Sequence, residues 1–226
     1  MMRTALACAA AMAVLLTAGA ASAQATPEVA WNLGVTSDYV FRGYSQTSED
    51  PAVFGGVDLT IGSFYAGAWA SNVDFGDETD AEIDLYGGFR SEIAGFAVDI
   101  GGVGYFYASQ PAGADYDYAE LKAAASRAIG PVTLGAAVYW SPDFFGVDDE
   151  ATYVEANVAI SPAPKWTVSG AVGHQSLDVN DDYATWNAGV AYALTDHVAI
   201  DARYFDTDVD GPLSDERVVA TLKFLF

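Results

Sequence analysis

Two pairs of opposite charges lie in stretches where apolar and polar residues alternate. Asp38 and Arg42 are four residues apart, and Asp84 and Arg90 are six residues apart. An even separation places two side chains on the same face of a β-strand. If that face lines a pore, charges of both signs can select permeant ions. If it lines a closed interior, the charges can pair and hold neighbouring strands together, so the sequence leaves both roles open.

His174 and Ser176 are residue types that can act as a base and a nucleophile, and outer-membrane lipases carry such residues on a barrel wall. Neither a Gly-x-Ser-x-Gly elbow nor another paired motif accompanies them. They also share one strand instead of facing each other across two strands. We therefore assign no catalytic residue and expect no enzymatic activity, with a lipid-modifying enzyme as the least favoured alternative.

The run Asp206-Thr207-Asp208-Val209-Asp210-Gly211 resembles the opening of a calcium-binding loop. The glutamate that such a loop needs at its twelfth position is replaced by Arg217. Weak binding of divalent cations, bridging to lipopolysaccharide phosphates, remains open. A solvated acidic rim is favoured, because blocks of like charge mostly repel one another and attract water. We assign no metal site and no cofactor.

The C-terminal segment 217–226 alternates between a greasy face and a mixed, partly charged face. The greasy face carries Val218, Ala220, Leu222, Phe224 and Phe226. A soluble β-sandwich could also end in a strand, but an apolar strand at the very end of a soluble chain invites aggregation. The segment resembles the closing strand of bacterial outer-membrane barrels. This likeness implies that Leu222, Phe224 and Phe226 form an assembly signal read by the barrel assembly machinery.

The first residues have the pattern of a secretory signal peptide. Arg3 precedes an apolar run, and Ala21-Ser22-Ala23 is a small-residue cleavage site, so we expect residues 1–23 to be removed. The single cysteine, Cys8, lies inside this segment. The chain has 31 acidic and nine basic residues and a net charge of −22. Such an excess of acid argues against nucleic acid as a partner.

The mature part, residues 24–226, shows about twelve alternating stretches separated by turns. The first is expected over Trp31–Arg42. The fifth, Phe96–Tyr107, has an uncertain phase because of its glycines, and we allow for a bulge there. The sixth, Tyr118–Ser126, is rich in alanine and is assigned as a strand only by its neighbours.

The links between these stretches are sorted by length and charge. Those after even-numbered strands are short, beginning with Gly62-Ser63. Those after odd-numbered strands are generally longer, and together they hold 19 of the 31 acidic residues and no Lys or Arg. An up-and-down barrel places these two sets on opposite rims, with long loops outside the cell and short turns in the periplasm. A soluble sandwich gives no reason for this sorting.

The run Ser37-Asp38-Tyr39-Val40-Phe41-Arg42-Gly43-Tyr44-Ser45-Gln46 and the two hairpins around it resemble the TorF-type porin family. The resemblance extends more loosely to the terminal strand. It implies an outer-membrane barrel with a transport role, and it supplies no established substrate or residue role.

The sequence thus predicts an all-β protein, a single up-and-down antiparallel transmembrane β-barrel of twelve strands in the cell outer membrane. We expect a narrow passive channel for small solutes or ions, cation-favouring at low salt. A structural or adhesive barrel with a plugged lumen is the alternative. Expected partners are outer-membrane lipids, lipopolysaccharide and the assembly machinery. The candidate pore-lining residues are Asp38, Arg42, Asp58, Asp84, Arg90, Glu120, Lys122, Glu155, Asp201, Arg203, Arg217 and Lys223.

Overall fold

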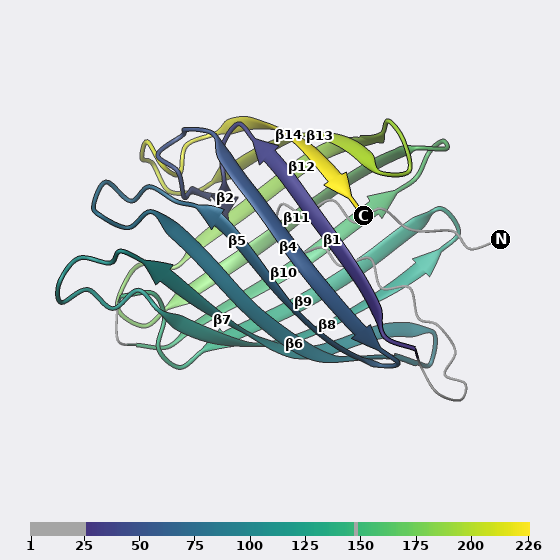
Figure 1. Cartoon of the computed structure of the whole chain (residues 1–226), viewed down its shortest axis with the longest axis horizontal. Helices are drawn as coiled ribbons and strands as arrows, with labels where there is room; N and C mark the ends of the chain where they lie inside the picture. Colours follow the sequence, from purple (N-terminus) through teal and green to yellow (C-terminus); the bar gives the residue numbers. More distant parts are fainter. Residues whose placement is uncertain (1–25, 147–148) are drawn as a thin grey trace.

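The computed structural model describes residues 26–146 and 149–226, so the expected signal peptide lies outside the described residues. Strands dominate, and twelve of them close into one antiparallel barrel in the order β1-β14-β13-β12-β11-β10-β9-β8-β7-β6-β5-β4 (Figure 1). In the described part of the chain, no helix reaches the length and hydropathy that a membrane crossing requires. The predicted fold class and strand number are confirmed.

The barrel strands are β1 (Glu28–Thr36), β4 (Ala52–Ile61), β5 (Phe64–Asn72), β6 (Ala81–Ile93), β7 (Phe96–Ala108), β8 (Tyr118–Ile129), β9 (Val132–Ser141), β10 (Ala151–Ile160), β11 (Trp166–Leu177), β12 (Tyr183–Ala193), β13 (Val198–Thr207) and β14 (Arg217–Leu225). Short turns gather at one end and longer loops at the other (Figure 1). Gly62 adopts φ +61° in the first short turn, a conformation that glycine reaches without strain. The alanine-rich sixth stretch is a barrel strand, as expected.

The barrel closes where β1 meets β14, with Thr36 opposite Thr221 and Asn32 opposite Leu225. Two main-chain bonds of 3.0 Å, one in each direction between Trp31 and Phe226, extend this ladder to the last residue. Closure removes the unpaired edges that an open sheet would present.

The outer wall is apolar and the inner wall polar. Val218 and Leu121 point outward and are 71% and 62% exposed, whereas their neighbours Val219 and Lys122 are buried inside. An exposed apolar band around a whole barrel is unfavourable in water and suits lipid. Leu222, Phe224 and Phe226 lie on the outward side of β14, Phe226 being 68% exposed. Their role as an assembly signal stays a prediction.

One predicted strand is wrong in its second half. β1 ends at Thr36, and the chain then forms a small separate hairpin from β2 (Val40–Phe41) and β3 (Tyr44–Ser45). Arg42 and Gly43 turn this hairpin with φ +46° and +88°. Two successive residues with positive φ make a tight hairpin turn, which alternation alone does not reveal. Asp38 and Arg42 therefore do not share the face of a spanning strand.

The glycine-rich fifth stretch forms β7 without a bulge. The register runs without interruption from Ala81 opposite Ala108 to Ile93 opposite Phe96, and β7 pairs with β8 equally regularly. Gly88 and Gly101 are opposite each other, and a Cβ on either would collide with backbone and with the Tyr65 hydroxyl. These glycines leave room for the Tyr65 hydroxyl against the inner wall, so they mark a close approach and not an irregular ladder.

Candidate functional site in the barrel lumen

The segment Asp38–Thr47, hereafter the L1 hairpin, folds into the barrel and is locked by its own hydrogen bonds. The Asp38 carboxylate accepts from Ser45 Oγ at 2.7 Å and from Thr47 Oγ1 at 3.0 Å, which closes the base of the hairpin. The amide of Gln46 donates to the carbonyl of Tyr39 at 2.6 Å. Backbone ladders join Val40 to Ser45 and Phe41 to Tyr44. The L1 hairpin is thus a defined element and not a loose loop.

Arg42 lies at the tip of the L1 hairpin and reaches two distant strands. Its guanidinium donates to Glu120 on β8 at 2.7 Å and to Gln175 on β11 at 2.9 Å. It also lies over the rings of Tyr153 and Tyr139, 4.4 and 5.2 Å from their centroids. Burial is the largest single influence and opposes the charged form, but the Glu120 carboxylate together with Tyr105 and Tyr118 outweighs it, so the pKa of Arg42 is raised. The Arg42 side chain at the tip is therefore permanently charged, and the Glu120 carboxylate balances its charge.

The remaining side chains of the L1 hairpin touch the rest of the inner wall. Tyr39 donates to Glu82 at 2.7 Å, and burial together with this carboxylate raises the pKa of Tyr39 well above its ordinary value. The phenol therefore stays protonated and acts as a donor. Counting all its contacts, the hairpin meets every strand from β5 to β14, through Trp69, Glu82, Tyr105, Glu120, Tyr139, Tyr153, Gln175, Tyr183, Phe205 and Val219.

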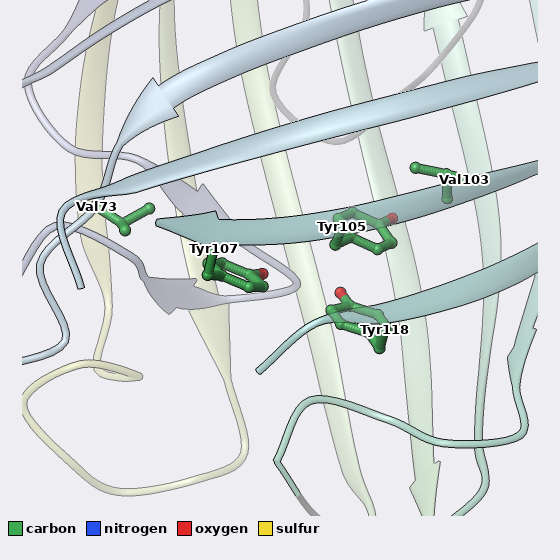
Figure 2. Close-up of a cluster of buried hydrophobic side chains, with 5 residues drawn as sticks. All are labelled: Val73, Val103, Tyr105, Tyr107 and Tyr118. Carbon is green, nitrogen blue, oxygen red and sulfur yellow. The ribbon is translucent and has the colours of Figure 1, made fainter. Parts of the chain in front are cut away.

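An aromatic wall faces the L1 hairpin on β7 and β8. Tyr105 and Tyr118 stack with ring centroids 4.3 Å apart, and Tyr107 lies nearer the loop end of β7 (Figure 2). Phe41 of the hairpin meets Tyr105 edge to face, at 5.9 Å between centroids. Such ring pairs contribute stabilisation beyond their buried area. Packing against these rings holds the L1 hairpin in one position.

Arg217 at the start of β14 fastens the L1 hairpin to the rim. Its guanidinium donates to Asp38 at 3.0 Å and to the carbonyl of Pro212 at 2.9 Å. The amide of Ser45 donates to the carbonyl of Leu213 at 2.8 Å. The loop before β14 and the L1 hairpin are therefore held together by the Arg217 guanidinium and by one main-chain hydrogen bond.

A second charged group lies on β6, β7 and β8. Asp99 is fully buried and binds Lys122 at 2.8 Å, Arg90 at 3.4 Å and the Tyr65 hydroxyl at 2.8 Å. Lys122 and Arg90 were predicted to face the lumen, but Asp99 was missed because the phase of its strand was uncertain. Asp99 lies directly opposite Arg90 in the β6–β7 ladder, and this cross-strand pairing of opposite charges could have identified it as a lumen residue.

The other predicted candidates also lie inside the barrel and have partners. Arg203 meets Asp201 at 3.4 Å and donates to Asn187 and Ser169 at 2.7 and 2.8 Å. The further contacts join Asp58 to Tyr86, Glu155 to Asn157, and Lys223 to the ring of Phe54. Such pairing supports the structural role for most single residues. Whether these residues line an open pore stays a prediction.

Asp84 is the exception among the inner carboxylates. It is 5% exposed, and among the described residues its buried Oδ1 has no hydrogen-bond partner. Its neighbour Glu82 on the same face is 2% exposed and was not among the predicted candidates. Asp84 and Arg90 both face the interior, in line with their even spacing, but Arg90 pairs with Asp99 and not with Asp84.

The outer surface does not assemble a catalytic triad. His174 Nε2 lies 3.4 Å from Asp182 Oδ2, and Ser176 also interacts with the Asp182 carboxylate. The backbone amide of Leu177 donates to the same carboxylate, which lowers the pKa of Asp182. A base needs direct contact with its nucleophile, and within the described residues the histidine and serine both meet the aspartate instead.

The segment that resembles a calcium-binding loop, Asp206–Gly211, forms hydrogen bonds with neighbouring residues of the protein. Asp208 accepts from the amide of Ala184 at 2.7 Å, and Asp206 accepts from the Tyr204 hydroxyl at 2.7 Å. Across residues 26–146 and 149–226, no cluster of three acidic, histidine or cysteine side chains is placed to hold a metal ion.

The Arg42–Glu120 pair should contribute strongly to stability. We expect Glu120→Gln to lower the free energy of unfolding by about 3 kcal/mol, because it leaves a buried guanidinium without its anion. Urea unfolding in lipid vesicles measures the change. His174→Gln is the matched control, since it breaks a half-exposed pair that contributes about 0–1 kcal/mol. A loss for Glu120→Gln no larger than for the control would contradict a locked L1 hairpin.

Comparison with known proteins identifies the family of this chain and solved structures with the same fold. A family model described as "Bacterial protein of unknown function (Gcw_chp)" matches residues 20–224. No protein of curated function matches the sequence. The resemblance to TorF-type porins stays a prediction, since the matched description assigns no transport role.

Solved structures that share the fold include two of the KdgM porin. The KdgM porin aligns with a TM-score of 0.60 at 5% sequence identity, covering 89% of this chain and 98% of its own. The KdgM porin in complex with disordered oligogalacturonate aligns with a TM-score of 0.61 at 6% identity, covering 89% and 99%. At such identities the likeness concerns the fold alone.

Proposed function

Because the chain belongs to the Gcw_chp family of bacterial proteins, whose function is unknown, we propose a function from the lumen itself. The protein is a narrow, passive channel for small solutes or ions in the outer membrane. The L1 hairpin forms its constriction. The observation that carries the proposal is a closed barrel whose inner wall bears charges of both signs around an inward-folded segment. Porins share this fold.

The location is proposed on the same grounds. An apolar outer band suits contact with outer-membrane lipids, and a closed barrel leaves no strand edge unpaired. The signal peptide expected from the sequence would direct export, and Phe226 would be read by the assembly machinery. The acidic loop end would face lipopolysaccharide.

We propose that cations are favoured at the mouth. The loops on the long-loop rim are acidic, and their field concentrates cations and repels anions. Reversal potentials across a potassium chloride gradient test this, and we expect cation preference around 0.1 M salt. The preference from the loops should weaken toward 1 M, where the screening length falls from about 10 Å to about 3 Å. Anion preference at low salt would mean that the lumen bases dominate.

The name of one structural neighbour includes an oligogalacturonate, which is a polyanion. We do not propose oligogalacturonate as a ligand of this chain, because an acidic rim repels a polyanion and the sequence identity to that porin is 6%.

A structural or adhesive barrel is the second candidate, and one observation favours it. The L1 hairpin contacts the wall from β5 round to β14, as a permanent plug would. The two functions differ in whether ions cross the purified protein in a planar bilayer. A lipid-modifying enzyme is disfavoured by the arrangement of His174, Ser176 and Asp182.

A further inference from the structure

Arg127 is the one basic residue in the described ranges whose side chain leaves a barrel strand on the outer face. It lies two residues before the end of β8, in phase with the exposed Leu121 and Ile129. The other basic side chains of the described strands and of the L1 hairpin have partners inside the barrel. Lys165 lies in a short turn, where its Nζ donates to a carbonyl at 3.3 Å. Arg127 is exposed, so its charge meets whatever surrounds the wall near the short-turn end.

The Arg127 guanidinium lies over an aromatic ring and, within the described chain, meets no carboxylate. Its central carbon is 5.1 Å from the ring centroid of Phe96, the neighbouring residue across the β7–β8 ladder, where Ala97 is opposite Ser126. The ring attracts the cation but leaves its N–H donors without an oxygen acceptor. Glu92, at the end of the adjacent strand β6, lies in the inward phase of that strand. The guanidinium is therefore open to an anion from outside the chain.

Apolar side chains surround this cation on the outer wall. Leu134 is opposite Arg127 in the β8–β9 ladder, and Ile129 lies nearer to the turn. Both are exposed, as is Phe96, so the charge lies within the apolar band and not beyond it. A cation on the lipid face of a barrel is destabilising, and the cost grows with its depth. An anion at the membrane interface offsets this cost, and the phosphates of anionic lipids are the anions found there.

Small side chains continue the outer wall from Arg127 toward the middle of the barrel. Ala125 and Ala123 follow it on the outward side of β8 before the next large residue, Leu121. Ala125 is opposite Ala136 of β9, which is also outward and exposed. A single methyl group projects less than its larger neighbours, so an acyl chain can contact the wall along this strip. The cation and the strip together match a head group and the chain that extends from it.

We propose that Arg127 binds the phosphate of an anionic glycerophospholipid at the short-turn end of the barrel, and that Ala125 and Ala136 seat one of its acyl chains. This inference rests on the membrane location proposed above and is independent of whether ions cross the lumen. The planar guanidinium donates paired N–H bonds to phosphate oxygens. Phosphatidylglycerol suits a single cation, because its head group carries no positive charge. Phosphatidylethanolamine brings its own ammonium group, which competes with Arg127 for the phosphate.

Native mass spectrometry of the purified mature barrel measures this binding, with phosphatidylglycerol and phosphatidylethanolamine of identical acyl chains as the probes. We expect the wild type to bind phosphatidylglycerol more tightly. Arg127→Gln should weaken the binding of phosphatidylglycerol about fivefold, the contribution of one basic residue at a membrane surface. Arg127→Lys should keep most of the affinity. Lys165→Gln is the matched control, since it removes a cation at the same rim, and it should leave the affinity unchanged.

Ala136→Leu tests the acyl seat while Arg127 stays in place. A larger side chain there fills the strip, so we expect weaker binding of both lipids, which carry the same acyl chains. Heat-modifiable migration in gels verifies that each variant is folded. Ala136→Leu faces lipid and Arg127→Gln removes no contact inside the barrel, so either variant decides the inference if the other fails to fold.

Unchanged affinity for phosphatidylglycerol in folded Arg127→Gln, or an equal loss in Lys165→Gln, would overturn the site and leave the membrane location standing. Equal affinities of the wild type for the two lipids would overturn the anionic head group. A wild-type barrel that fails to float with lipid vesicles would contradict the membrane location itself.

Discussion

Removing the L1 hairpin is expected to enlarge the pore several-fold. In a variant whose residues 39–46 are replaced by a short Gly-Ser link, the wall contacts from β5 to β14 disappear together. The barrel ladders remain, because β1 ends at Thr36 and β4 begins at Ala52. Liposome-swelling rates should rise, and sugars excluded by the wild type should enter.

The matched control shortens the loop over residues 178–182, which joins β11 to β12 at the same end of the barrel. We expect that variant to keep the wild-type size limit. Equal swelling rates for the wild type and the hairpin-less barrel would mean that solutes do not pass the L1 hairpin at all.

Changing Phe226→Asp should reduce the yield in the outer membrane at least tenfold. Phe226 closes the barrel through its main-chain bonds to Trp31 and presents a 68% exposed ring on the outer wall. A carboxylate at this point would face the membrane interface, where burying a charge is unfavourable. The expected fate of the chain is retention in the periplasm.

Fractionation of cells expressing each variant measures this effect. Phe226→Tyr keeps an aromatic ring suited to the interface and serves as the control, which should assemble at the wild-type level. A normal outer-membrane yield for Phe226→Asp would remove the assembly role predicted for the last residue.

The barrel could be predicted from the sequence because its information is local and repeated. Alternation assigns faces strand by strand, as in β14, where Val218 lies outside and Val219 inside. The sorting of acid into the longer links then orders the strands into an up-and-down barrel. Neither inference requires knowing which residues touch across the lumen.

The L1 hairpin could not be predicted in the same way, because its stability is not local. Tyr39 and Phe41 continue the alternation of β1, so period two extends past the true strand end at Thr36. A positive φ at Arg42 is unfavourable in isolation and is offset by contacts with Glu120 and Gln175. These partners lie 78 and 133 residues away along the chain. Spacing in the sequence gives no sign of them.

The aromatic residues show the same limit. Trp31 and Trp166 lie outside, as residues at a membrane interface do. Tyr39 and Trp69 instead meet inside the barrel, with ring centroids 5.3 Å apart. An aromatic residue near a strand end suits either face, and only the inward course of the L1 hairpin decides between them.

The most direct test of the constricted-channel account is single-channel recording of the purified wild type and the hairpin-less variant under identical conditions in planar bilayers. We expect small, discrete conductance steps for the wild type and steps several-fold larger for the variant. Silence in the wild type with large steps in the variant would identify the L1 hairpin as a permanent plug and the protein as a structural barrel. Equal steps in both would contradict the constriction.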